Sequence, residues 1–182
     1  ERTSFTWIEF SGRTGFISGY HFPKRPAHDS TGRQWPQMGI LIQTNDGGET
    51  WKPTSSAVFG RLAQTRVGGR TAALVLQFDF EFEWPSEVYR IDLPTGKTVR
   101  EYRETSRRVC SAAILPKGEI AVVARREGKE RTEYARPLEL WVGGEPKGID
   151  ERMTASSCYL AADGVTLWLA SDAGMVERLA IP

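Results

Sequence analysis

The chain has 182 residues, of which 40% are hydrophobic and 26% are charged, which is ordinary for a globular protein with one sizeable core. Its formal net charge of +1 gives no global electrostatic case for binding nucleic acid or an anionic membrane. No apolar run approaches the roughly 18–20 residues of a membrane span, and no signal peptide is visible. Because the chain opens at Glu1 without Met, we expect a processed or excised fragment.

Four similar turns, each followed by an apolar strand, recur along the chain at Gly12, Gly69, Gly118 and Gly164. The spacing between consecutive glycines, 46 to 57 residues, fits a four-stranded propeller blade, for which roughly 40–50 residues is usual. A third strand is expected in each unit, at residues 39–43, 87–92, 138–142 and 175–180. No stretch has a sustained helical period, so no helix is predicted.

The connection over residues 21–38 interrupts the first unit between its second and third strands. Long loops on a rigid scaffold concentrate binding residues, and Arg and Trp are typical of binding hot spots. The first interpretation of this loop is a solvated insertion packed over its own blade. The alternative is a recognition loop, and if the chain binds a carboxylate, a glycan or a partner peptide we expect Arg25, His28, Arg33 and Trp35 to make the contacts. Neither histidine has a convincing metal-ligand spacing, so no metal site is predicted.

Residues 44–51, Thr-Asn-Asp-Gly-Gly-Glu-Thr-Trp, directly follow the apolar run 39–42. The pattern predicts a strand, a tight turn and a returning strand, because an Asp side chain accepts backbone N–H groups and glycine takes positive φ without strain. We expect Asp46 to accept bonds from its own turn and Trp51 to be largely buried. Thr44, Asp46, Gly48 and Trp51 are therefore predicted to be structural residues and not catalytic ones.

Two later segments carry patterned charge. Residues 78–84 alternate aromatic and acidic side chains, which a strand would place on opposite faces. We interpret the aromatic face as packing between blades and the acids as solvated or paired with arginines; a cation site or an acidic stripe for a basic partner is the alternative. Residues 125–136 mix both signs around Gly128, which indicates an exposed hairpin tip more than a nucleic-acid patch.

The two cysteines, Cys110 and Cys158, match neither a disulfide-dense scaffold nor a zinc spacing. Packing within strands is the expectation for each, and pairing with one another or a reactive thiol are the alternatives. The sequence contains no nucleophile elbow, P-loop or His-Glu-x-x-His motif. No catalytic residue and no cofactor is therefore predicted.

Residues 44–51 match Ser/Thr-x-Asp-x-Gly-x-Thr-Trp, so this segment resembles the Asp-box (BNR) turn of sialidase-like and related β-propellers. In that family the motif is a folding device. The stretch from Met38 to Trp51 resembles more particularly the non-enzymatic group typified by photosystem II stability/assembly factors, whereas the Phe/Tyr-Arg-Ile-Pro motif of sialidases does not occur. The resemblance implies a scaffold or assembly role and slightly favours an extracytoplasmic or secreted location.

The predicted fold is all-β, a β-propeller or propeller segment of about four four-stranded antiparallel blades, with units at approximately 6–56, 57–106, 107–154 and 155–182. The last unit stops after its third strand. We interpret the chain as a fragment of a larger ring of roughly six to eight blades; the alternative is that residues 2–5 supply the missing strand and four blades close.

The predicted function is a non-catalytic scaffold that binds a protein. The alternative is a glycan-binding or sialidase-like glycoside-hydrolase propeller whose catalytic residues lie partly outside this chain. No nucleic acid partner and no membrane span are expected. Self-association, or pairing with a missing propeller half, remains open.

Overall fold

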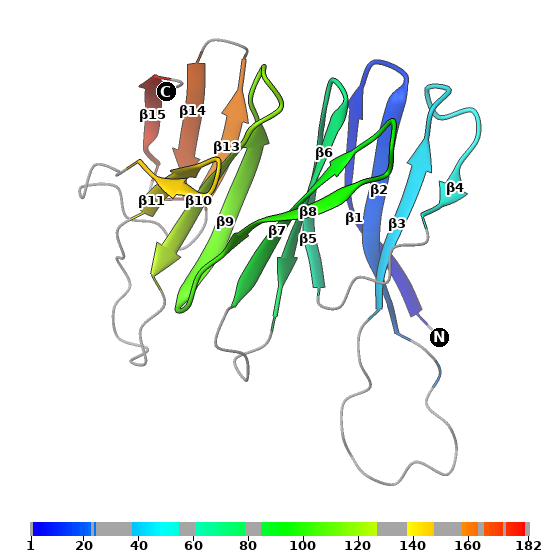
Figure 1. Cartoon of the computed structure of the whole chain (residues 1–182). Coiled ribbons are helices and arrows are strands. Elements are labelled where there is room, and N and C mark those ends of the chain that lie inside the picture. Colours follow the sequence, from blue (N-terminus) through cyan, green and yellow to red (C-terminus); the bar gives the residue numbers. More distant parts are fainter. Residues whose placement is uncertain are drawn as a thin grey trace, which may run out of the picture.

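The computed structural model describes residues 2–22, 24, 38–54, 61–78, 85–126, 138–147, 158–163, 166–172 and 174–180. Within these residues the chain forms strands and turns and contains no helix. The strands make four antiparallel sheets, each of which follows the chain in order (Figure 1). The all-β class and the repeated antiparallel blades predicted from the sequence are therefore confirmed.

Sheet 1 contains β1 (Arg2–Ser11), β2 (Thr14–Phe22), β3 (Met38–Thr44) and β4 (Lys52–Pro53). Sheet 2 contains β5 (Arg61–Gly68), β6 (Thr71–Gln77), β7 (Ser86–Asp92) and β8 (Thr98–Arg103). Sheet 3 contains β9 (Arg107–Ile114), β10 (Ile120–Arg126), β11 (Leu138–Val142) and β12 (Glu145–Pro146). Sheet 4 contains β13 (Cys158–Ala162), β14 (Thr166–Ser171) and β15 (Val176–Ala180).

The glycine turns between first and second strands have the backbone that the repeat requires. Gly12 and Gly69 lie in the β1–β2 and β5–β6 turns with φ of 60° and 55°. A β-carbon is strained in this left-handed region, so glycine is favoured at both turns. Gly164 lies outside the described residues.

The first strand excludes one alternative that the sequence left open. Residues 2–5 do not complete sheet 4, because they belong to β1 and pair with β2, from Arg2 opposite Phe22 to Phe5 opposite Gly19. The hairpin at Gly12 places β2 beside these residues at a small loop-closure cost, whereas pairing with sheet 4 would close a loop of almost the whole chain. Sheet 4 keeps three described strands.

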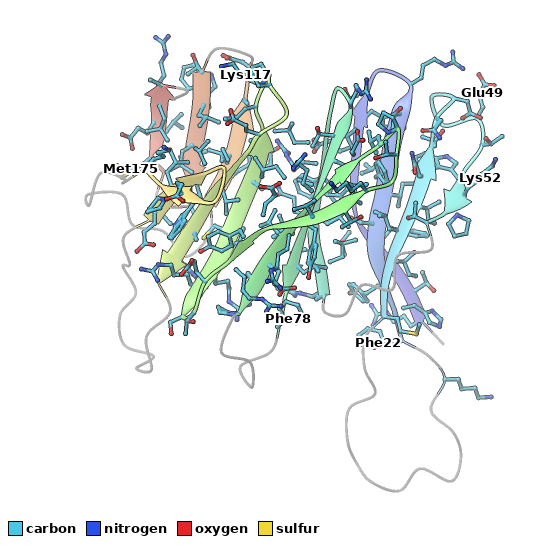
Figure 2. All side chains as sticks on the ribbon, viewed as in Figure 1. Phe22, Glu49, Lys52, Phe78, Lys117 and Met175 are labelled. Atoms are coloured by element: carbon cyan, nitrogen blue, oxygen red, sulfur yellow. The ribbon has the colours of Figure 1, made fainter. Side chains whose placement is uncertain are left out.

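The sheets stack face to face, and three hydrophobic clusters fill the spaces between them (Figure 2). Along β6, Ala72, Leu74 and Leu76 pack toward sheet 1, while Ala73 and Val75 pack toward sheet 3. Strand β10 divides its side chains in the same way between sheets 2 and 4. These middle strands are buried on both faces, which explains why their sequences are continuous apolar runs.

The outer faces of sheets 1 and 4 have no described sheet against them. Phe5 and Ile8 are each 58% exposed on sheet 1. Trp168 is 42% exposed on sheet 4, between Leu167 and Leu169, which face sheet 3 and are fully buried. The described blades therefore form an open stack with an apolar face at each end.

The four first strands lie side by side along the stack, and side chains connect their edges. In each neighbouring pair, a side chain of one first strand accepts a hydrogen bond from a backbone N–H of the next. The pairs are Glu9 Oε1 with Val67 N at 3.1 Å, Gln64 Oε1 with Ala112 N at 2.9 Å, and Ser111 Oγ with Leu160 N at 3.0 Å. These bonds satisfy edge groups that no neighbouring strand reaches.

Each of the first three sheets also has a β-bulge in its first strand. The pairing skips Thr6 in β1, Ala63 in β5 and Cys110 in β9. Ala63 and Cys110 both pack against the cluster shared with the next sheet. A bulge redirects a side chain, so in sheets 2 and 3 this irregularity turns one small residue toward the next sheet.

Candidate binding site at the inner strands

The four residues predicted to bind a partner, Arg25, His28, Arg33 and Trp35, lie outside the described residues. The strands that flank their loop are described, and His21 pairs with Met38 where the loop leaves sheet 1. Phe22, at this end of β2, and Phe78, just after β6, lie at the same end of the stack (Figure 2). The acids of the 79–84 segment also lie outside the described residues.

The structure brings together a cluster that the sequence did not predict. Arg66 of β5 donates from Nη1 to Glu9 Oε2 at 2.9 Å and to the hydroxyl of Tyr159 at 2.6 Å. Its Nη2 donates to the carbonyl of Leu160 at 3.3 Å. Because Glu9, Arg66 and Tyr159 come from sheets 1, 2 and 4, the first strands of these sheets surround a common centre.

Trp7 completes this inner-strand cluster from β1. It lies two residues before Glu9, on the same face of the strand, and its Nε1 donates to Glu9 Oε2 at 3.2 Å. Its ring stacks on Tyr159, with centroids 6.1 Å apart and an interplanar angle of 29°. The guanidinium of Arg66 lies 5.1 Å from the centroid of the Tyr159 ring, a cation–π distance.

Charge and aromatic surface are separated within the cluster. The side chains of Arg66 and Glu9 are only 9% and 20% exposed, and the pair compensates two charges that burial would otherwise make costly. Tyr159 is 43% exposed and Trp7 is half-buried. The cluster therefore offers aromatic rings to a ligand and keeps its ionic groups inside, an arrangement suited to binding.

One signal for this cluster was present in the sequence. Arg66 lies in a strand whose neighbours Thr65 and Val67 are buried, and a charge in such a strand needs a partner. The partner could not be found from sequence, because Tyr159 is 93 positions away.

The turn over residues 44–51 is held by its own side chains. Asp46 Oδ1 accepts the backbone N–H of Thr50 at 2.9 Å, the kind of bond expected from the sequence, and the hydroxyl of Thr44 at 2.7 Å. Thr44 Oγ1 accepts the N–H of Gly48 at 3.0 Å, and Trp51 Nε1 donates to the Gly48 carbonyl at 3.0 Å. Hydrogen bonds from the Thr50 hydroxyl and N–H, and then from Thr44, lower the pKa of Asp46.

The turn also docks against the β1–β2 hairpin. Arg13 donates from Nη2 to the Asp46 carbonyl at 2.8 Å, and its own carbonyl accepts the N–H of Gly47 at 2.8 Å. Trp51 packs edge-on against Phe10, with centroids 5.8 Å apart at 78°. The prediction that Trp51 is largely buried is wrong: it is only partly buried, because both rings lie at the open outer face of sheet 1.

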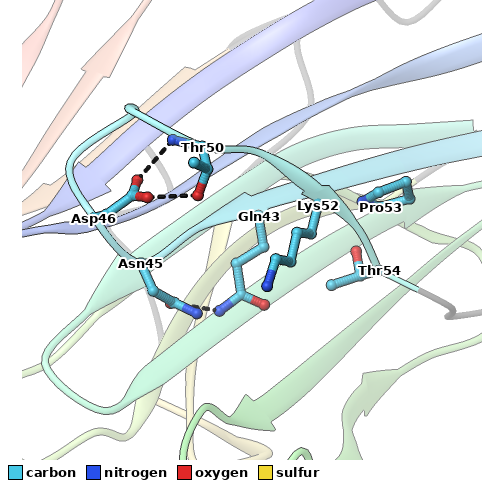
Figure 3. A pocket seen from close by; sticks show the side chains of 7 residues that line it. All are labelled: Gln43, Asn45, Asp46, Thr50, Lys52, Pro53 and Thr54. Atoms are coloured by element: carbon cyan, nitrogen blue, oxygen red, sulfur yellow. Dashed lines mark hydrogen bonds between the residues drawn. The ribbon is translucent and has the colours of Figure 1, made fainter.

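A shallow groove of about 300 Å³ runs along this turn (Figure 3). Its lining residues are Gln43, Asn45, Asp46, Thr50, Lys52, Pro53 and Thr54. Gln43 Nε2 donates to Asn45 Oδ1 at 2.9 Å, and both Asp46 oxygens accept bonds from the turn itself. The carboxylate of Asp46 is thus engaged in holding the turn.

In the part of the chain that the structure describes, no group of three or more His, Cys, Asp or Glu side chains is arranged to hold a metal ion. Nor does that part contain a helix long and apolar enough to cross a membrane.

No protein-family model and no curated protein sequence matches the chain. Solved structures do match in fold. The structure of YCF48 bound to D1 peptide is 17% identical with a TM-score of 0.54, covering 97% of this chain and 48% of that one. The β-propeller domain of the Trilobed protease from Pyrococcus furiosus is 10% identical with a TM-score of 0.55, covering 98% of this chain and 57% of that one.

A third similar structure is the α-L-arabinofuranosidase Arb93A from Fusarium graminearum with an iminosugar inhibitor. It is 14% identical with a TM-score of 0.52, and the match covers 93% of this chain and 60% of that one. At these identities the similarity shows the fold alone. The fold is a β-propeller segment, and the chain spans about half the length of the propeller structures that it matches.

Proposed function

We propose that this chain is a non-catalytic binding propeller that holds a protein segment at its inner-strand cluster. One observation carries the proposal: Arg66 and Glu9 pair their charges inside the cluster, while Tyr159 remains 43% exposed. Tyr, Trp and Arg are the residues that most often dominate protein interfaces, and rigid rings give contact area at low entropic cost.

The bonding of Glu9 supports binding over catalysis. Its two oxygens accept three N–H groups, from Trp7, Arg66 and the backbone of Val67. A carboxylate that serves as base or nucleophile needs a lone pair directed at the reacting group. Glu9 instead connects β1 to β5, which suits a rigid binding platform.

The similarity of this fold to solved propeller structures supports a particular class of partner. One similar propeller structure contains a bound peptide, and by this analogy of fold we propose a peptide segment of a protein as the ligand here. We also propose an Asp-box origin for the turn at residues 44–51. Its residues Thr44, Asp46, Gly48 and Trp51 hold one another, as a folding device would.

The loop over residues 21–38 is proposed as a second contact region, through Arg25, His28, Arg33 and Trp35. The two strands that flank this loop, β2 and β3, end at one end of the stack, where the corresponding strands of sheet 2, β6 and β7, also end. We further propose that blade-like sheets, from self-association or from a pairing propeller half, cover the outer faces that expose Phe5 and Trp168.

Selection from a displayed peptide library tests the binding proposal. We expect enriched peptides to bind the protein and to lose at least tenfold in affinity with Tyr159→Ala. The matched control is Trp168→Ala, because Trp168 is 42% exposed on the outer face of sheet 4, away from the cluster. Equal affinity for both variants would reject the inner-strand cluster as the site. The loop is tested in the same assay with Arg33→Ala and Trp35→Ala.

A glycan-binding or glycoside-hydrolase role is the second candidate, and the convergence of Arg66, Glu9 and Tyr159 is the observation that favours it. One similar propeller structure is an α-L-arabinofuranosidase. Turnover of aryl arabinofuranosides or aryl sialosides, lost in Glu9→Gln, would decide for this candidate and against the scaffold.

A further inference from the structure

The two cysteines of the chain meet in the fold. Cys110 lies on β9 of sheet 3 and Cys158 on β13 of sheet 4, and their side chains are in hydrogen-bonding contact. Both thiols are reduced, half-buried and packed against the hydrophobic cluster between these two sheets. A pair of thiols contributed by different blades is positioned for a reaction that neither could undergo alone.

The local backbone explains why they meet. Cys110 is the residue that the β9–β10 pairing skips, so the bulge turns its side chain toward sheet 4. The adjacent Ser111 accepts the N–H of Leu160 at 3.0 Å, which holds β9 against β13 beside the thiols. Cys158 lies two residues before Leu160 and shares its face of β13. Ala63 occupies the corresponding bulge of sheet 2.

The surroundings divide the roles of the two sulfurs. The hydrogen bond with Cys110, followed by burial, raises the pKa of Cys158, while the charge of Arg125 acts in the opposite direction and that of Asp172 adds to the rise. Cys158 therefore keeps its proton, so the reaction begins at the sulfur of Cys110 once that thiol has lost its own proton. A thiolate is the nucleophile in thiol–disulfide exchange.

We propose that Cys110 and Cys158 form a dithiol modification site that a small disulfide oxidant, of the glutathione disulfide class, converts into a disulfide joining sheets 3 and 4. The Cys110 thiolate attacks one sulfur of the oxidant, and the first glutathione thiolate leaves. The Cys158 sulfur then gives up its proton and attacks the Cys110 sulfur of the mixed disulfide, expelling the second thiolate. The protein loses two electrons and two protons, and both pass to two molecules of reduced glutathione.

The disulfide would close a loop from Cys110 to Cys158 that includes most of sheet 3 and the entry to sheet 4. Closing a loop of this length in the unfolded chain stabilises the folded state. Among the described residues, sheet 4 shares a hydrophobic cluster with sheet 3 alone, so it gains most from a covalent link. The bond would thus fasten the end blade of the stack under oxidising conditions and release it under reducing ones.

The test equilibrates the protein with glutathione disulfide and, separately, with dithiothreitol. We expect a mass loss of about 2 Da in the oxidised monomer, which corresponds to two hydrogens, and a proteolytic peptide pair linked through Cys110 and Cys158. The oxidised protein should melt roughly 5–15 °C above the reduced one. Glutathione adducts alone, a disulfide-linked dimer, or no oxidation would each overturn the proposal.

Cys110→Ala is the control, because alanine already occupies the corresponding bulge at residue 63. This variant should show no internal disulfide and the same melting temperature with either reagent. A rise of the same size in Cys110→Ala would contradict the proposal, as would an unchanged melting temperature in the oxidised wild type. Should the variant fail to fold, the comparison of the oxidised and reduced wild-type protein still decides.

Discussion

Removing Glu9 is the sharpest test of the inner-strand cluster. Glu9→Ala leaves the Arg66 charge nearly buried, with its Nε already lacking a partner among the described residues. Loss of one partner of a buried pair costs about 3–5 kcal/mol, and an unsatisfied backbone N–H, here that of Val67, costs about 1–3 kcal/mol. Because Glu9 is 20% exposed, water recovers part of both costs. We expect a loss of about 3–4 kcal/mol in the free energy of unfolding.

Replacing both Glu9 and Arg66 separates the energetic effect of their charges from that of their packing. Glu9→Leu with Arg66→Met removes both charges and keeps similar volume, so it should cost less than the sum of the two single changes by at least about 1 kcal/mol. The assay is urea denaturation followed by far-UV circular dichroism. Glu49→Ala is the control, because Glu49 is 78% exposed and lies 3.7 Å from Arg13. It should change stability by no more than about 0.5 kcal/mol.

Two results would refute this reasoning. A loss below about 1 kcal/mol in Glu9→Ala would mean that water solvates Arg66 freely in the folded protein. Strict additivity of the two single changes would mean that Glu9 and Arg66 contribute independently, and the cluster would no longer be a coupled platform.

Three further predictions concern single residues. Gly19→Ala should lower the free energy of unfolding by about 3 kcal/mol in the same urea assay, because a β-carbon there would clash with the Ser4 carbonyl oxygen. The control Gly12→Ala has open space around the added β-carbon and should lower the free energy of unfolding by only about 1 kcal/mol. Tyr102→Phe should leave stability unchanged or raise it by up to about 1 kcal/mol, because the buried hydroxyl has no partner among the described residues. Asp46→Asn should be less stable than wild type at pH 7, because folding lowers the pKa of Asp46 and the charged carboxylate therefore stabilises the folded state. Thermal melts should show this difference shrinking below about pH 3.9, since the stabilisation is lost as the pH falls from the pKa of the unfolded chain through that of the folded one.

The repeat architecture was predictable because its determinants are local. A glycine with positive φ such as Gly12, followed by a β-rich run, specifies a hairpin within about ten residues, and a recurring hairpin specifies a stack of blades. The third strands appeared close to their expected positions for the same reason. The alternative in which residues 2–5 complete the last sheet does not occur, because strand pairing also depends on loop closure, which favours the adjacent hairpin.

The inner-strand cluster could not be predicted because its residues lie far apart in the sequence and come from different sheets. Trp7, Arg66 and Tyr159 meet only after three sheets have stacked. Contact between Cys110 and Cys158 was likewise only an alternative at the level of sequence. A β-bulge turns one thiol toward the other, and this bulge is visible only once the strand pairing is known. Blade-internal features follow from short patterns, whereas features between blades depend on the relative placement of the sheets.

The bonds between first strands have a direction that bears on how the stack is built. In every pair the accepting side chain comes from the earlier blade, as with Glu9, and the donating backbone N–H from the later one, as with Val67. Losing a blade at the carboxyl-terminal side leaves a side-chain oxygen that water readily satisfies, whereas losing one at the amino-terminal side exposes a strand edge. During synthesis the earlier blade emerges first. The side chain that accepts the bond is therefore already present when the backbone N–H of the next first strand emerges.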